Sequence, residues 1–193
     1  MVRRNFYEIR IHGRGGQGAW TASLILAQAA VIEGKYAQSF PEFGPERSGA
    51  PVTAYARIGN EPIHIHCGIT EADYIIIIDP TLVDRAKRGI RKGGKIIATY
   101  PEPPEVLRKE LRINSGIEVW GVDAVKIALD VIGRPIANTA MLGAFVRATE
   151  EKIVKLDSLV EAVRKVLGAR LPEEVVEKNI QAVKRAYEEV KKG

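Results

Sequence analysis

Two kinds of hydrophobic pattern follow one another along this chain. Apolar and polar side chains alternate over residues 7–12, which is typical of a half-buried strand, whereas residues 74–78 are continuously apolar, as in a strand buried on both faces. Towards the C-terminus, apolar residues recur at helical spacing in two stripes, over 156–167 and 176–190. The patterns therefore predict an α/β protein whose last part is helical.

The remaining elements complete an alternation of strands and helices. Strands are predicted at 7–12, 35–40, 52–58, 63–67, 73–78, 95–99 (after a turn at Gly93-Gly94) and 117–122. Helices are predicted at 19–32, 81–88, 105–111, from the N-cap Asp123 to 132, after an N-cap at Asn138 or Thr139, and along the two stripes. The short connection 59–62 predicts an antiparallel hairpin, so the sheet is expected to be mixed.

These elements fit into one domain over residues 1–193. We expect a Rossmann-like, three-layer α/β fold, in which a mixed sheet is flanked by helices. The C-terminal helical pair, residues 152–193, is expected to pack on this domain and to cover one sheet face. The alternative is that these helices dock onto another subunit. Pro172 separates the two helices at a position where a helix start tolerates proline.

A glycine-rich loop joins the first strand to the first helix. It reads Gly13, Arg14, Gly15, Gly16, Gln17 and Gly18. Unpaired backbone amides and a helix N-terminus attract phosphate at such a point, and glycines let a ligand approach without Cβ clashes. The alternative interpretation is a tight strand-to-helix turn that binds nothing.

Composition and charge narrow the classes of function. The single cysteine, Cys67, cannot form an internal disulfide or hold an iron–sulfur cluster, and neither a leader nor a membrane span is evident, so we expect a cytoplasmic protein that binds no membrane. The net charge is +5, and residues 85–112 carry nine Lys/Arg against three Glu. Because no aromatic interleaving accompanies this charge, we expect no nucleic-acid partner.

Other chemistries find less support in the sequence. His64 and His66 share one face of a predicted strand, but without a third ligand we interpret them as solvent-facing rather than metal-binding. A stand-alone NAD-type dehydrogenase domain is the alternative function, and it requires an acid at the end of the second strand. Glu33 has the right spacing but belongs to the helix end, and no Walker-type lysine or activated nucleophile is present.

Three sequence blocks, found in this order, give a sharper indication. They are Gly13–Gly18, Phe40–Val52 and Asn138–Ala144, supported by Arg57-Ile58, Pro62-Ile63 and Asp79-Pro80. Together they resemble the gamma subunit of the pyruvate (2-oxoacid):ferredoxin oxidoreductases over nearly the whole chain. The last block departs from the family pattern at Ala140, where proline is usual.

The resemblance implies a subunit of a hetero-oligomeric enzyme that is inactive alone. The complex would decarboxylate a 2-oxoacid, which we expect to be pyruvate, to acyl-CoA and CO2 and would reduce ferredoxin. Thiamine diphosphate and iron–sulfur clusters would lie in the alpha, beta and delta partner subunits, while this chain would help to bind coenzyme A. The site residues implied are Gly13, Arg14, Gly15, Gly16, Gln17, Gly18, Glu46, Arg47, Asn138 and Thr139.

The proline-rich loop over residues 41–51 has its own two interpretations. Glu46 and Arg47 can form an exposed ion pair of little energetic weight. Alternatively, the flanking prolines restrict the loop, so that the Arg47 guanidinium is positioned to pair with a carboxylate or phosphate across a subunit boundary. The second interpretation predicts that this loop faces the partner subunits.

Overall fold

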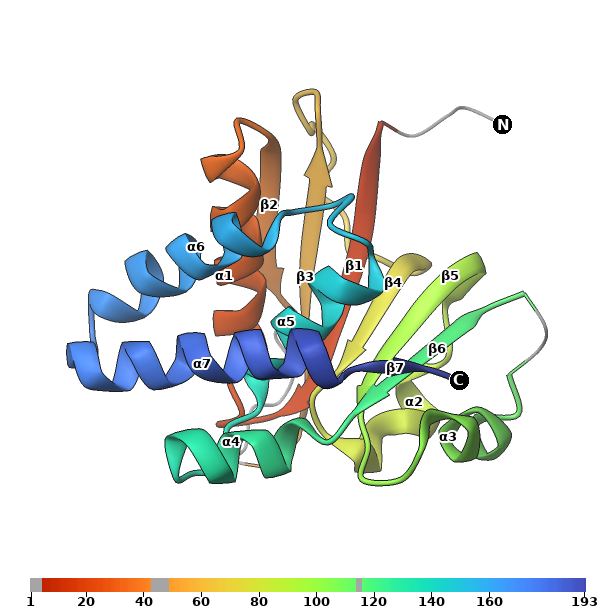
Figure 1. Cartoon of the computed structure of the whole chain (residues 1–193). Coiled ribbons are helices and arrows are strands. Elements are labelled where there is room, and N and C mark those ends of the chain that lie inside the picture. The colour runs from red at the N-terminus through yellow and green to blue at the C-terminus, as the bar shows by residue number, and fades with distance from the viewer. Residues whose placement is uncertain (1–4, 43–48, 114–115) are drawn as a thin grey trace.

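A computed structural model describes residues 5–42, 49–113 and 116–193 of the chain. Within them, seven strands form one mixed sheet in the order β2-β3-β1-β4-β5-β6-β7 (Figure 1). The pairs β1–β4, β4–β5 and β5–β6 are parallel, and the other three pairs are antiparallel. The strands are β1 (Phe6–Arg14), β2 (Tyr36–Pro41), β3 (Pro51–Gly59), β4 (Ala72–Ile77), β5 (Ile90–Thr99), β6 (Glu118–Val122) and β7 (Lys191–Lys192).

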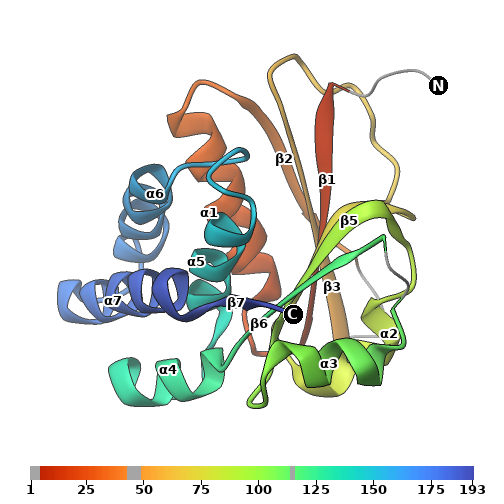
Figure 2. The ribbon, with the colours of Figure 1, turned by 45° about the vertical axis from the view of Figure 1, so that its right-hand side comes forward.

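Helices cover both faces of the sheet, which gives the three layers predicted from the sequence. On one face lie α1 (Ala19–Ile32), α4 (Ala124–Ile132), α5 (Asn138–Ala148), α6 (Leu156–Gly168) and α7 (Glu173–Glu189); on the other lie α2 (Val83–Ala86), entered through the 3-10 turn Pro80–Leu82, and α3 (Pro104–Leu111) (Figure 2). The continuous apolar run of β4 serves both: Ile76 packs in the core of the first face and Ile75 and Ile77 in that of the second. The predicted fold class is confirmed.

The two C-terminal helices lie outside the layer next to the sheet. Helix α6 packs on α1, while α7 packs on α5 and α4. The α5–α7 approach is close, because a Cβ on Gly143 would lie 2.0 Å from the carbonyl oxygen of Val183. Thr139 at the start of α5 adds a buried hydrogen bond of 2.9 Å to Asn179 of α7.

The predicted hairpin between 52–58 and 63–67 is wrong. Strand β3 pairs with β1 and β2, and residues 62–66 form no strand. Side chains hold this segment instead of a ladder, since buried Arg57 donates to the carbonyls of Ile65 (3.3 Å) and Cys67 (2.7 Å). The sheet is still mixed, because β3 runs antiparallel to both neighbours. His64 and His66 are exposed, as the solvent-facing interpretation predicts.

Three smaller expectations also need correction. Gly93 and Gly94 lie inside β5, at an irregularity in its pairing with β4, rather than in a turn before it. The N-cap of α5 is Ala137, so neither Asn138 nor Thr139 caps this helix. The predicted helix 81–88 is divided into the 3-10 turn and the short α2. By contrast, Asp123 caps α4 as predicted, by accepting the N–H of Lys126 at 2.9 Å.

No helix in the described ranges combines the length and the apolar character needed to cross a membrane.

Candidate functional site

The carboxyl ends of the parallel strands meet along one edge of the sheet. Strand β1 runs into the glycine loop there, β4 into Asp79, β5 into Tyr100 and β6 into Asp123. Ligands of open α/β sheets bind outside this edge, because the loops and helix N-termini that follow the strands converge on it. Two regions along the edge differ in charge, and we describe each in turn.

The glycine loop has the backbone conformation that only glycine adopts easily. Gly16 has φ 94° and Gly18 has φ 77°, both in the left-handed region. Gly18 is the N-cap of α1. Because glycine has no side chain, it offers no side-chain acceptor to the backbone amides in the first turn of this helix. A Cβ on exposed Gly16 would meet nothing within 4 Å, so this position is open towards solvent.

Hydrogen bonds of Gln17 and Asp79 hold the glycine loop in its conformation. The Gln17 side chain accepts the N–H of Arg14 at 2.7 Å and donates to the Asp79 carboxylate at 2.7 Å. The same carboxylate accepts the backbone N–H of Thr81 at 2.9 Å and also the Thr81 hydroxyl. Burial raises the pKa of Asp79, but the hydrogen bonds from Thr81 and Gln17 outweigh it and lower the pKa overall. The carboxylate therefore stays ionised and acts as an anchor.

Arg14 connects this anchor to a neighbouring loop. Its Nε lies 3.4 Å from Asp79, its Nη2 donates to the Thr81 hydroxyl at 2.7 Å, and its Nη1 donates to the Gly49 carbonyl at 3.1 Å. A guanidinium has five N–H donors, so one hydrogen remains on each terminal nitrogen. The side chain is 34% exposed, which leaves those hydrogens within reach of an anion.

The end of the proline-rich loop lies directly on the glycine loop. Gly15 donates to the carbonyl of Ala50 at 2.9 Å, and Gly49 donates to the carbonyl of Gly15 at 3.3 Å. The structure thus brings together two of the three sequence blocks. Glu46 and Arg47 themselves lie outside the described residues.

The third block reaches the same point through one residue. The Asn138 side chain donates to the Gly18 carbonyl at 3.3 Å, and a Cβ on Gly18 would lie 2.4 Å from Asn138 Nδ2. Thr139 is fully buried and turns away to α7, so it supports the helices rather than the loop. Of the two, only Asn138 contacts the glycine loop.

Sequence reasoning missed three residues at this place. Asp79 and Thr81 form the anchor, and Trp20 in the first turn of α1 is 52% exposed beside the loop. The available signal for Asp79 was its position, since it directly follows the continuous apolar strand that pairs with β1. A polar side chain at the carboxyl end of such a strand faces the ligand edge.

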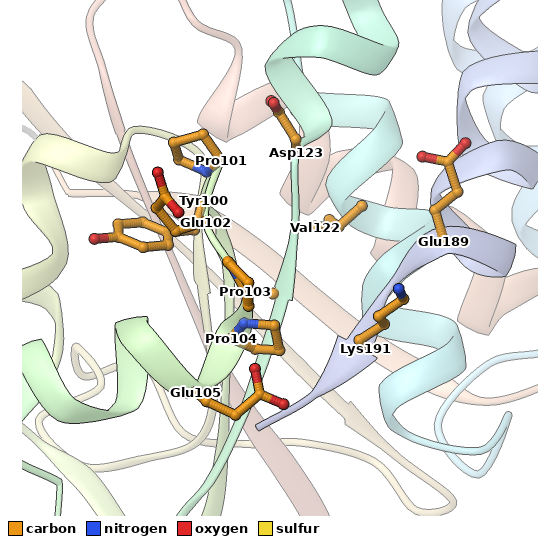
Figure 3. A pocket seen from close by; sticks show the side chains of 11 residues that line it. Tyr100, Pro101, Glu102, Pro103, Pro104, Glu105, Val122, Asp123, Glu189 and Lys191 are labelled. Carbon is orange, nitrogen blue, oxygen red and sulfur yellow. The ribbon is translucent and has the colours of Figure 1, made fainter.

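The other end of the edge carries an acidic pocket of about 410 Å³. Figure 3 shows Glu189 and Lys191 on one side of it and Pro103, Pro104 and Glu105 on the other. It is lined by Tyr100, Pro101, Glu102, Pro103, Pro104, Glu105, Gly121, Val122, Asp123, Glu189 and Lys191. The lining has four carboxylates and only one ammonium group, so it repels phosphate. This pocket therefore does not extend the glycine loop into a larger anion site.

The geometry disfavours the NAD-type alternative. Strand β3 lies between β1 and β2, so the end of β2 is two strand spacings, about 10 Å, from the end of β1. Glu33, the acid at the expected spacing, closes α1 and accepts the N–H of Lys155 at 2.6 Å. Burial raises the pKa of Glu33, but its bonds to Lys155 and Lys35 lower it overall, so this carboxylate serves as a structural contact.

The sheet order, the flanking helices and the anchored glycine loop define a Rossmann-like α/β protein with a built strand-to-helix loop at its ligand edge. Residues 8–189 match the family described as pyruvate ferredoxin/flavodoxin oxidoreductase. The chain therefore belongs to the pyruvate ferredoxin/flavodoxin oxidoreductase family.

Individual relatives match along nearly their whole length. The chain is 44% identical to the pyruvate synthase subunit PorC of Thermotoga maritima, covering 98% of this chain and 97% of the relative. It is 46% identical to the pyruvate/ketoisovalerate oxidoreductases common subunit gamma of Pyrococcus furiosus, covering 94% and 95%. The crystal structure of the Thermotoga maritima pyruvate oxidoreductase subunit PORC superposes with a TM-score of 0.85 at 40% identity, covering 98% and 99%. The resemblance predicted from the three sequence blocks is confirmed.

Within the described residues, no group of three or more His, Cys, Asp or Glu side chains could hold a metal ion. Cys67 is free and exposed.

Proposed function

We propose that this chain is the gamma subunit of a multisubunit 2-oxoacid:ferredoxin oxidoreductase, and that pyruvate is the 2-oxoacid. The complex oxidatively decarboxylates the 2-oxoacid, transfers the acyl group to coenzyme A and reduces ferredoxin. Support comes from the similarity, over nearly the full length of both chains, to relatives named pyruvate synthase subunit and common subunit gamma. The alpha, beta and delta subunits are the partners in this proposal.

Within the complex, the glycine loop takes phosphate groups of coenzyme A. The observation that carries this is the open left-handed position of Gly16, held in place by the Gln17–Asp79 hydrogen bond of 2.7 Å. A rigid loop at a helix N-terminus presents amides to an anion with little further loss of entropy. The unused hydrogens of Arg14 add a cation beside these amides. The residues present therefore fit a phosphorylated ligand.

The other cofactors belong to the partner subunits in this proposal. A four-iron cluster requires several thiolates, and this sequence contains one cysteine. Thiamine diphosphate and the clusters would supply the decarboxylation and electron-transfer chemistry. This chain's own residues bind and orient the acyl acceptor.

The test is Gly16→Val in the reconstituted complex. A β-branched side chain resists the φ of 94° and occupies the open space over the loop, so the KM for coenzyme A should rise by about tenfold or more. The KM for pyruvate and the iron and thiamine contents should not change. Gly34→Val is the matched control, because Gly34 follows the other end of α1 with φ 74° and equally open surroundings.

Two results decide the proposal. If both glycine variants leave the KM for coenzyme A unchanged in folded, assembled complexes, the loop is a structural turn. If Gly34→Val raises this KM as much as Gly16→Val does, the effect is general strain in α1 rather than lost ligand contact.

We also propose that the loop containing Glu46 and Arg47 faces the partner subunits. Its end is anchored on the glycine loop through Gly49 and Ala50, close to the proposed coenzyme site. Arg47→Ala should lower activity or weaken assembly by about tenfold, the scale of one charged interfacial contact. The melting temperature of the subunit should stay within a few degrees. Normal assembly and turnover would make this loop a simple connection.

A further inference from the structure

A second anion-binding candidate lies on the α2 side of the sheet. It is an open pocket of about 740 Å³, lined by Arg10, Thr70, Asp84, Arg85, Arg88 and Gly89, which we call the arginine pocket. Its arginines come from β1, from α2 and from the turn between α2 and β5. Three guanidinium groups from separate elements therefore converge on one hollow.

Among the described residues, no salt bridge neutralises the three arginines of this pocket. Its one carboxylate, Asp84, is 86% exposed and pairs with Lys87 at 2.8 Å. In the described part of the chain, neither Arg10, Arg85 nor Arg88 forms a salt bridge with a carboxylate. The arginines elsewhere on this face, such as Arg57 and Arg91, are paired with acids. An unpaired cluster is unfavourable unless something negative binds to it.

The backbone is shaped to hold Arg10 in the pocket. Its Nη1 donates to the carbonyls of Arg88 at 2.9 Å and Thr70 at 3.4 Å. Gly89 has φ 81°, and a Cβ there would lie 2.6 Å from Arg10 Nη1 and 2.3 Å from the Thr70 oxygen. Only glycine leaves space for the guanidinium at this position. The Nε of Arg10 is buried and has no partner.

A neighbouring histidine responds to the same charge. His12 follows two residues after Arg10 on β1 and is 2% exposed. Burial, together with the positive charges of Arg10 and Arg85, lowers the pKa of His12 to about 3. A local excess of positive charge favours the neutral form of the His12 imidazole.

We propose that Arg10, Arg85 and Arg88 form a binding site for a multiply charged phosphate group, separate from the glycine loop. Guanidinium groups bind phosphate through paired N–H donors. Strand β1, helix α2 and the turn after α2 each supply one such group. The lining contains no apolar side chain, whereas a docking site for an acidic protein segment would have an apolar centre. A compact polyanion, free or as part of a nucleotide, is therefore the class of ligand that fits.

The experiment measures binding of inorganic pyrophosphate to the full chain by calorimetry at low ionic strength. In Gly16→Val, which removes the proposed glycine-loop site, the chain should bind one equivalent saturably, and adding Arg85→Ala or Arg88→Ala should weaken this binding by about tenfold or more. Arg170→Ala removes a guanidinium of the α6–α7 turn, where the residue is also exposed, and should have no effect. A second series with ADP shows whether the site takes the phosphates of a nucleotide equally well.

This inference and the proposed function can fail independently. Gly16→Val should leave the pyrophosphate binding that depends on Arg85 and Arg88 unchanged, because Gly16 does not line the arginine pocket. Absence of saturable binding in folded wild type overturns the site. Equal weakening by Arg170→Ala and Arg85→Ala also overturns it, because it shows a general charge effect. Binding of a polyglutamate peptide without binding of pyrophosphate would overturn it in favour of a protein interface.

Discussion

At β1 and β3, the two faces of the sheet bury their side chains by different means. On the face covered by α1 and α5, β1 contributes Ile9 and Ile11 to a continuous apolar core. On the opposite face the same strand contributes Glu8, Arg10 and His12, and its burial depends on ion pairs and hydrogen bonds. The strand alternates apolar and charged residues because it has one face of each kind. At β1 the apolar face stabilises the fold, while the polar face, which lies beside the second apolar core under α2 and α3, holds loops and presents cations.

Arg57 is the centre of the polar face. It is fully buried on β3, lies 3.1 Å from the carboxylate of Glu8 and donates to the Cys67 carbonyl at 2.7 Å. Arg91 joins the network by pairing with the other Glu8 oxygen at 3.1 Å and with Asp73. These contacts fix residues 62–67 over the sheet without a strand ladder. Such a network tolerates the loss of one partner poorly.

The largest expected effect is therefore that of Arg57→Ala. It removes the buried donor that Arg57 provides to Glu8 and to two carbonyls, so urea unfolding should show a loss of about 3–5 kcal/mol in the free energy of unfolding. On the apolar face, Phe145→Ala should cost a similar 3–5 kcal/mol by leaving a cavity. The double variant Arg57→Met with Glu8→Gln should lose less than Arg57→Ala alone. If the double variant loses more free energy of unfolding than Arg57→Ala does, the pairing of charges is not what this network contributes to stability.

Gly143→Ala tests the close packing of the apolar side. The added methyl group would overlap the Val183 carbonyl and force α5 and α7 apart, which should cost about 1–3 kcal/mol. Gly168→Ala is the control, since nothing lies within 4 Å of its Cβ and the substitution should be neutral or slightly stabilising. Equal stabilities of the two variants would contradict the close approach of the helices.

Acid should destabilise the polar face through His12. Its folded pKa is about 3 and its unfolded pKa about 6.5, so between these values the unfolded chain binds one more proton. The free energy of unfolding should consequently fall by about 1.4 kcal/mol for each pH unit below 6. In His12→Gln this part of the slope should disappear. An unchanged acid slope in the variant would show that His12 titrates normally.

The smallest effect is expected at the exposed helix surface. Lys178 pairs with Glu174 one turn earlier on α7 at 2.7 Å. Glu174→Ala should leave the midpoint of urea unfolding unchanged within experimental error, because solvent screens such pairs. A clear fall in the midpoint would show that exposed charges contribute more than this comparison assumes.

The elements that could be predicted from the sequence are those whose residue pattern is determined by the burial of apolar side chains. Helix α1 begins and ends where predicted, and the continuous run in β4 lies at the centre of the sheet, because burial of apolar residues determines both. The glycine loop was visible for a similar reason, since left-handed backbone positions select glycine.

The errors arose where a distant polar side chain determines the local structure. Residues 63–67 alternate as a strand would, but Arg57 and Gln38 take their carbonyls, and that competition is not encoded locally. The Asp79 anchor likewise depends on β4 lying beside β1, which spacing along the chain does not show. The neighbourhood of Asn138 and Gly18, 120 positions apart, became evident only with the fold.

Hydrogen–deuterium exchange on the assembled complex, with and without coenzyme A, tests the proposed coenzyme site most directly. If the phosphates bind the glycine loop, the amides of residues 15–22 should exchange more slowly with the ligand, while those around Gly34 should not change. Gly16→Val should abolish this protection. Saturating coenzyme A that protects only partner subunits, with residues 15–22 unaffected, would contradict the account.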